Sequence, residues 1–133
     1  MKLERLLLQR EINITANRLL ILSNLIAEPT TVSLKMLEES MPHMERSTIY
    51  RTLKTFEAHK LVHTIDDGTG ITKYGLCATS CDCTLQDQHL HFHCLQCERT
   101  ICLQERITIH CLPAQYEVQS AHLVLKGRCA DCN

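Results

Sequence analysis

The stretch His89-Leu-His-Phe-His-Cys-Leu-Gln-Cys97 and the distant pair Cys129-Ala-Asp-Cys132 decide how the second half of this chain folds. Both contain a Cys-x-x-Cys, a spacing that lets one tight turn direct two thiolates at the same ion. Four sulfur ligands are the number that a closed tetrahedral zinc site takes. The interval between the two pairs is longer than a compact zinc ribbon contains, and a strand–helix–strand unit would fit in it. The sequence therefore predicts a structural Zn²⁺ site, and the alternatives are disulfides or unrelated buried thiols. The predicted ligands are Cys94, Cys97, Cys129 and Cys132.

Length and composition restrict the class of protein. The 133 residues suffice for one domain or two small ones, and two small cores would each be marginal without a staple such as a metal. Nine cysteines without an export signal predict a reducing cytoplasm, where thiols bind metal or carry redox chemistry. No apolar stretch is long enough to span a membrane, so we expect a soluble protein. The net charge of −1 gives no indication of nucleic-acid binding, although the first half is slightly basic and the second half acidic.

The first 76 residues have the element order of a winged helix-turn-helix. Hydrophobic spacing predicts helices at 2–10, 16–27, 34–39 and 46–59, with Thr15 and Ser33 as N-caps of the second and third. Strand-like runs at 61–66 and 71–76 flank Asp67-Gly68-Thr69-Gly70, a hairpin signal. The side chains expected to face the core are Leu3, Leu6, Leu7, Leu19, Leu22, Ile26, Ile49, Leu53 and Phe56.

The rest of the chain reads as a hinge and a small α/β domain. Residues 77–88 are polar and rich in cysteine, which favours a hinge between domains at 1–76 and 89–133. Beyond it we expect strands at 89–94 and 99–103, a short helix at 105–111 and a strand at 116–126. Strand alternation would place His89, His91 and His93 on one face. The predicted fold class is α+β.

The exposed face of the predicted helix at 46–59 is the second chemical feature. With its apolar side turned inward, this helix shows Ser47, Tyr50, Arg51 and Lys54 to solvent. Arg and Lys bind phosphates, Arg also binds guanine edges, and a Tyr ring can cover a thymine methyl. An ordinary solvated helix face is the alternative. Arg18 lies in the first turn of its helix, where the positive helix end disfavours a cation, so either a DNA phosphate or local packing would explain its place.

Together these motifs resemble the ferric uptake regulator family of bacterial metal-sensing repressors. The matching stretches are Thr15-Ala-Asn-Arg18, Ser47-Thr-Ile-Tyr-Arg-Thr-Leu53, the hairpin, His89-x-His91-x-x-Cys94-x-x-Cys97 and Cys129-x-x-Cys132. The resemblance covers nearly the whole chain. It implies a DNA-binding winged helix joined to a dimerisation domain, and a homodimer that binds an AT-rich inverted repeat of double-stranded DNA when metal is loaded. The candidate DNA-binding residues are Arg18, Ser47, Thr48, Tyr50, Arg51 and Lys54.

A second, regulatory metal site is implied by the likeness to the zinc uptake regulators of this family. Its ligands would be His63, Cys77, His89 and His91, with Cys102 as a further candidate. A set of Cys and His suits Zn²⁺, whereas the iron-sensing members use carboxylates and histidines. Gly75 and Cys102 stand where the iron pattern has glutamates. The sequence therefore favours a zinc-sensing repressor of metal-uptake genes.

Other functions stay open at this stage. The surplus thiols, among them Cys81 and Cys83, are compatible with an iron-, peroxide- or thiol-sensing member of the same family. A zinc enzyme is disfavoured, because the His-x-Glu of zinc deaminases and the His-Glu-x-x-His of metalloproteases do not occur. A zinc-stapled protein-interaction module is the remaining reading, and the polar helix face argues against it.

Overall fold

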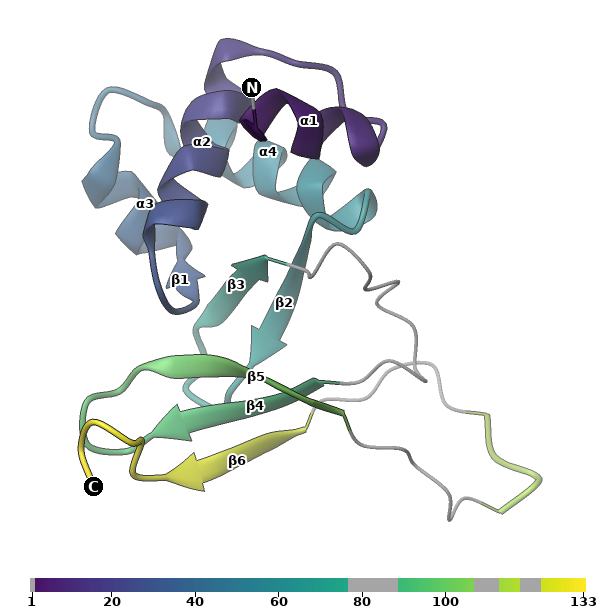
Figure 1. Ribbon diagram of the computed structural model, residues 1–133, viewed down its shortest axis with the longest axis vertical. Helices are drawn as coiled ribbons and strands as arrows, with labels where there is room; N and C mark the ends of the chain where they lie inside the picture. The colour runs from purple at the N-terminus through teal and green to yellow at the C-terminus, as the bar shows by residue number, and fades with distance from the viewer. Residues whose placement is uncertain (1, 77–88, 107–112, 118–122) are drawn as a thin grey trace.

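The computed structural model describes residues 2–76, 89–106, 113–117 and 123–133, except the side chains at 89 and 104–106. Its helices gather at one end, a first sheet lies beneath them, and a second sheet lies beyond the first (Figure 1). Each sheet has three strands, in the order β1-β3-β2 for the first and β5-β4-β6 for the second. In the described residues no helix is long and apolar enough to cross a membrane.

The first two helices form because local sequence begins them and apolar spacing packs them. Helix α1 covers Lys2–Gln9 and buries Leu7. Helix α2 covers Ala16–Ala27, and the Thr15 side chain caps it by accepting a hydrogen bond from the backbone N–H of Arg18. A side-chain cap of this kind satisfies one of the orphan N–H groups of a first turn. Both predicted helices are thus confirmed, together with the predicted cap.

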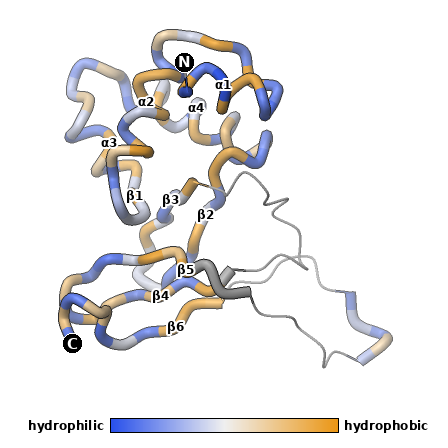
Figure 2. The backbone as a smooth tube through the Cα atoms, viewed as in Figure 1, coloured by the Kyte–Doolittle hydropathy of each residue, from blue (hydrophilic) through white to orange (hydrophobic). Residues whose placement is uncertain are grey.

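Helices α3 (Leu34–Ser40) and α4 (Arg46–Ala58) complete the helical layer. The hydroxyl of Ser33 accepts from the Met36 N–H, which confirms the second predicted cap. On α4 the predicted inward residues Ile49, Leu53 and Phe56 are all fully buried. Figure 2 shows hydrophobic and hydrophilic residues alternating in patches along the helices and the first sheet. The apolar patches meet in one core that also includes Tyr74 of the first sheet.

The first sheet extends from the helices toward the second sheet. Strands β2 (Val62–Asp66) and β3 (Thr72–Leu76) form the predicted hairpin, with His63 opposite Gly75. The two-residue strand β1 (Val32–Ser33) adds a third strand against β3 and was not predicted. The turn between β2 and β3 uses Gly68 and Gly70 at positive φ, a conformation that glycine adopts without a steric penalty.

The second sheet combines one antiparallel and one parallel pair. Strand β4 (His89–Cys94) pairs antiparallel with β5 (Thr100–Arg106), with an irregular register between His89 and His91. Strand β6 (Val124–Gly127) lies parallel to the other edge of β4, with Cys94 opposite Gly127. Because β4 and β6 are parallel, their C-terminal ends lie next to each other at the same end of the sheet.

Three sequence predictions require correction. The predicted helix at 105–111 is wrong at its start, because residues 105 and 106 belong to β5, whose pairing with β4 overrides local helix preference; the remainder lies outside the described residues. The predicted strand at 116–126 is wrong at Tyr116, which follows a turn. Residues 118–122 lie outside the described residues, and β6 covers only the end of the predicted strand. Ile26 is exposed, because the buried face of α2 is formed by Ile21, Leu22 and Leu25.

Candidate metal centres and the exposed face of helix α4

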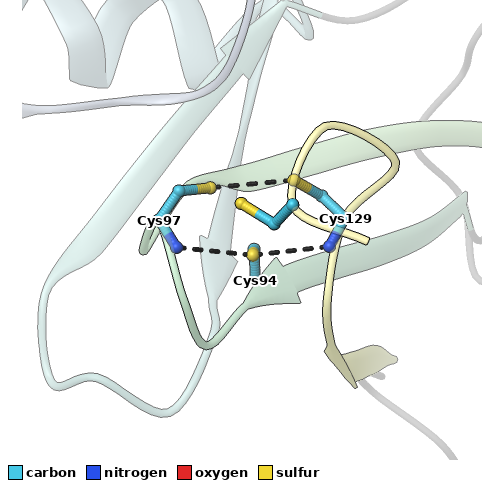
Figure 3. A group of neighbouring side chains, drawn as sticks. Cys94, Cys97 and Cys129 are labelled. Atoms are coloured by element: carbon cyan, nitrogen blue, oxygen red, sulfur yellow. Dashed lines mark hydrogen bonds between the residues drawn. The ribbon is translucent and has the colours of Figure 1, made fainter.

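Four cysteines converge where β4 and β6 end. The first Cys-x-x-Cys begins at the last residue of β4 and the second begins just after β6, and the chain turns tightly within both pairs. One sulfur atom from each residue lies within 4.8 Å of the others, so the predicted ligands come together, which excludes unrelated buried thiols. Figure 3 shows the side chains of Cys94, Cys97 and Cys129 directed at a common centre. The four-cysteine site consists of Cys94, Cys97, Cys129 and Cys132.

The sulfur spacing fits a tetrahedral metal and not a disulfide. The Sγ atoms of Cys97 and Cys129 are 3.8 Å apart, and all four cysteines are free thiols. A tetrahedral site with zinc–sulfur bonds of about 2.3 Å has sulfur–sulfur edges of about 3.8 Å. A disulfide would place two sulfurs about 2.05 Å apart. The donor set and its spacing therefore suit Zn²⁺.

Local hydrogen bonds prepare this site for thiolates. The backbone N–H groups of Cys97 and Cys129 each donate to the Cys94 sulfur at 3.4 Å and lower the pKa of Cys94 to about 5. The Arg99 guanidinium, 3.5 Å from the Cys97 sulfur, lowers the pKa of Cys97. The hydrogen bond with Cys129 and then burial raise the pKa of Cys132 to about 12. The hydrogen bonds thus favour thiolates in the first pair, and a bound metal cation would favour ionisation of the last thiol as well.

A second cluster joins the two sheets. His63 of β2, His91 of β4 and Cys102 of β5 place one ligand atom each within 4.8 Å of one another. Because His91 and Cys102 face each other in the β4–β5 pairing, the second sheet contributes two neighbouring candidate ligands. We call these residues the His63/His91/Cys102 site. All three side chains are half-buried.

The distances in this site also suit zinc. The Nε2 atoms of His63 and His91 are 3.3 Å apart, and the Cys102 sulfur is 3.8 Å from the Nε2 of His63. Tetrahedral zinc with bonds of about 2.05 Å to nitrogen and 2.3 Å to sulfur requires separations of about 3.3 Å and 3.6 Å. Three such donors leave a coordination position for one more ligand.

Gly75 provides the space that the His63 ring occupies. It is buried directly opposite His63 in the β2–β3 pair. A Cβ atom at this position would lie 3.3 Å from His63 Nε2 and 3.4 Å from Thr31 Cγ2. Any side chain at position 75 would therefore press on the nitrogen that faces the other two ligands.

A buried carboxylate adjoins this site. Asp67, 1% exposed, receives hydrogen bonds from the Lys73 ammonium at 2.8 Å and from the Thr100 hydroxyl. His93 Nδ1 lies 2.9 Å from that hydroxyl and 3.5 Å from the carboxylate. Burial by itself raises the pKa of Asp67, but hydrogen bonds from Lys73, Thr100 and Thr69 outweigh it and hold the pKa well below its usual value. These residues, Asp67, Lys73, His93 and Thr100, form the Asp67 cluster.

The predicted regulatory ligands are only partly described. The structure brings His63 and His91 together and adds Cys102, which was predicted as a further candidate. Cys77, Cys81, Cys83, Cys111 and the expected hinge at 77–88 lie outside the described residues, as does the side chain of His89. Sequence reasoning missed the Asp67 cluster, because Asp67 read only as a turn residue and nothing local signals its pairing with Thr100.

The predicted polar face of α4 is exposed. Ser47, Tyr50, Arg51 and Lys54 lie on the surface and Thr48 is half-buried. The Lys54 ammonium lies over the Tyr50 ring, 5.5 Å from its centroid, and 3.5 Å from a carboxylate oxygen of Glu57. Arg18 directs its guanidinium to the backbone carbonyl of Asn13 at 2.8 Å, so a local contact accounts for its position.

One family model matches most of the chain, and several solved structures share its fold. The model of the Ferric uptake regulator family matches residues 9–126. A solved structure of a ferric uptake regulator from Pseudomonas aeruginosa with manganese is 22% identical, with a TM-score of 0.65 over 98% of this chain and 99% of that one. A zinc uptake regulator complexed with zinc and DNA is 20% identical, with a TM-score of 0.70 over 98% and 90%. The holo form of a protein called XcZur is 18% identical, with a TM-score of 0.70 over 98% and 94%. No curated protein sequence matches the chain.

Proposed function

Because the chain belongs to the Ferric uptake regulator family, we propose that it is a metal-dependent, DNA-binding transcriptional repressor that senses zinc and controls metal-uptake genes. The observation that carries this proposal is the His63/His91/Cys102 site, since it takes ligands from both sheets and its distances suit zinc. Two imidazoles and a thiolate are borderline-soft donors, which favour Zn²⁺ over the harder ions that carboxylates select. In this proposal the one remaining position of a tetrahedral site is filled by Cys77 or by His89, the two other predicted ligands.

The four-cysteine site has a structural role in the proposal. Four thiolates leave no open position for an exchangeable ligand, as is usual for structural zinc. The site would join the ends of β4 and β6 in a small sheet that has little apolar core of its own. Within the part of this sheet that the structure describes, Cys94 and Cys129 are the buried apolar residues. The boundaries of this unit at 89–133 and of a winged-helix unit at 1–76 are part of the proposal.

The exposed face of α4 is the proposed DNA-reading surface. Arg51 and Tyr50 would contact bases and phosphates, with Ser47, Thr48 and Lys54 beside them and Arg18 on the backbone. The present contacts of Arg18 and Lys54 lie at the protein surface, where a phosphate can compete for both side chains. We propose that a homodimer presents two such faces to an AT-rich inverted repeat.

Regulation follows from where the ligands lie. His63 belongs to β2 of the first sheet, whereas His91 and Cys102 belong to the second sheet, so the site is complete only when the two sheets contact each other as they do here. When bound, zinc supplies a coordinate link among them. Ligand binding shifts a population only by its difference in affinity between poses, and about 1.4 kcal/mol of difference is a factor of ten.

The test measures DNA affinity against free zinc. Random duplex DNA is selected with the zinc-loaded dimer, and the enriched duplex is titrated by fluorescence anisotropy in zinc-buffered solution. We expect an AT-rich inverted repeat and at least about tenfold tighter binding in high zinc. His91→Ala should remove the zinc dependence but keep the tightly held first zinc. Arg51→Ala should weaken DNA binding at every zinc level, whereas Arg5→Ala, an exposed cation on α1, should not.

A response to a different signal would favour one of the alternative sensing functions. DNA affinity that responds to iron or manganese but not to zinc would contradict zinc sensing. Release of DNA by peroxide at constant zinc would indicate a thiol sensor. An unchanged zinc response in His91→Ala would exclude the His63/His91/Cys102 site as the regulatory centre.

A further inference from the structure

The Asp67 cluster links the hairpin of the first sheet to the second sheet without any metal. Asp67 lies in the β2–β3 turn, and Lys73 belongs to β3 of the same hairpin. His93 comes from β4, and Thr100 from β5. Thr31 adds a second link, because its hydroxyl and its N–H both donate to the Thr100 carbonyl, at 2.9 and 3.3 Å. Figure 1 shows the hairpin end of β2 and β3 next to β4 and β5.

Three members of this cluster, Asp67, His93 and Thr100, each lie two to four residues along the chain from a ligand of the His63/His91/Cys102 site. In the β4–β5 pairing His91 lies opposite Cys102, and His93 lies opposite Thr100, two residues further along. On the other side of the contact His63 is in β2, and Asp67 directly follows that strand. Each metal ligand is therefore joined through a short, paired length of strand to a member of the Asp67 cluster.

The chemistry of Asp67 makes this contact hard to break. The carboxylate is almost fully buried and accepts bonds from an ammonium and two hydroxyls, of Thr69 and Thr100. Separation of the sheets would remove the Thr100 donor from the carboxylate. Hydrogen bonds to a charged group are stronger than neutral ones, and leaving such a group partly unpaired is costly. The carboxylate thus favours the pose in which the hairpin contacts β5.

We propose that Asp67 is a positioning residue for the regulatory metal: it holds the β2–β3 hairpin against β4 and β5 so that His63 meets His91 and Cys102 before metal arrives. This inference rests on the proposed function, in which those three residues bind the regulatory zinc. Without Asp67 the metal would have to bring the two sheets together itself. Affinity falls by the fraction of chains in the binding-competent pose.

The test compares two neighbouring substitutions. Asp67→Asn removes the charge at the contact. Asp66→Asn makes the same change one residue earlier, at an exposed carboxylate whose bond to the Gly68 N–H stays within the turn. With the four-cysteine site already holding zinc, the second site is titrated with zinc against a competing chelator. We expect Asp67→Asn to bind the second zinc at least about tenfold more weakly than wild type, and Asp66→Asn to match wild type.

Cobalt(II) provides a readout that general damage would not reproduce. Cobalt bound at the second site should show a thiolate-to-metal absorption band from Cys102. In Asp67→Asn this band should keep its shape, because the ligands are the same, but appear at higher free cobalt. Equal midpoints in the two variants would overturn the inference, as would a changed band in Asp67→Asn. If wild type binds no second metal, the proposed function itself fails.

A second variant covers the case in which Asp67→Asn does not fold. Thr100→Val removes the hydroxyl that donates to Asp67 but keeps the side-chain shape and the carbonyl that Thr31 uses. It should weaken second-site binding in the same direction, with the first zinc retained. Undiminished affinity in Thr100→Val would contradict the proposed positioning role.

Discussion

The contact between Gly75 and His63 gives the sharpest prediction for the metal site. In Gly75→Ala a new Cβ would stand 3.3 Å from Nε2 and 3.5 Å from Cε1 of His63. Relaxed contacts of this kind lie at about 3.5–4.0 Å, so the ring must retreat by a few tenths of an ångström. Metal–ligand distances tolerate about 0.2 Å. We therefore expect second-site zinc affinity to fall about tenfold, which corresponds to about 1.4 kcal/mol.

Stability should respond differently to the same substitution. Alanine inside a strand is favoured over glycine by about 0.5–1 kcal/mol, and an off-rotamer ring costs a similar amount, about 0.5–1.5 kcal/mol. The two terms nearly cancel, so the free energy of unfolding without the second metal should change by less than about 1 kcal/mol. Loss of metal affinity without loss of stability is the signature to look for.

The assay is a zinc competition titration paired with urea unfolding. Gly127→Ala is the matched control, because its Cβ would crowd a ring equally, the Phe92 Cζ at 3.2 Å, away from the His63/His91/Cys102 site. Its second-site affinity should stay at the wild-type value. Equal second-site affinities in Gly75→Ala and wild type would refute the reasoning, and so would an equal loss in both glycine variants.

Three further predictions concern stability. The pKa of Asp67 is lowered in the folded state, so the ionised side chain contributes its full stabilisation above the unfolded value of 3.8. This stabilisation is lost as pH falls through the folded pKa. The difference in unfolding free energy between wild type and Asp67→Asn, measured by urea titration, should therefore shrink on acidification. Thr15→Ala removes the cap bond to the Arg18 N–H and should cost about 1 kcal/mol in chemical unfolding, whereas Thr15→Asn should cost little. Leu53→Ala, at a fully buried position, should cost about 2–5 kcal/mol in the same assay, with metal stoichiometry unchanged at neutral pH.

Local signals account for the parts of the fold that the sequence predicted well. The caps at Thr15 and Ser33 and the apolar spacing of α4 depend on residues close together in the chain. They can therefore be predicted without knowledge of the tertiary structure. The two Cys-x-x-Cys pairs are equally easy to recognise, because their residue type and spacing are typical of structural zinc sites. By contrast β1 is two residues long and exists only because it pairs with Tyr74 and Lys73.

Cross-strand register explains what the sequence could not rank. Cys102 belongs to the candidate metal site because it lies opposite His91. The register of the β4–β5 pair shifts between His89 and His91, so the two histidines do not follow one regular pairing. Nothing near Cys102 in the sequence indicates this partner. The same holds for Asp67, whose neighbours indicate a turn, although its main role depends on Thr100, 33 residues away in the chain.

The parallel pairing of β4 and β6 has a consequence for how the protein assembles. The β4–β5 hairpin needs only a tight turn, but Cys97 and Cys129 are 32 residues apart and meet only when β6 has paired with β4. Contacts between distant segments form slowly, because loop closure precedes any stabilising gain. Four thiolates are thus available together only at the end of this step. The time at which a refolding chain begins to retain zinc against a chelator would therefore measure when β6 pairs with β4.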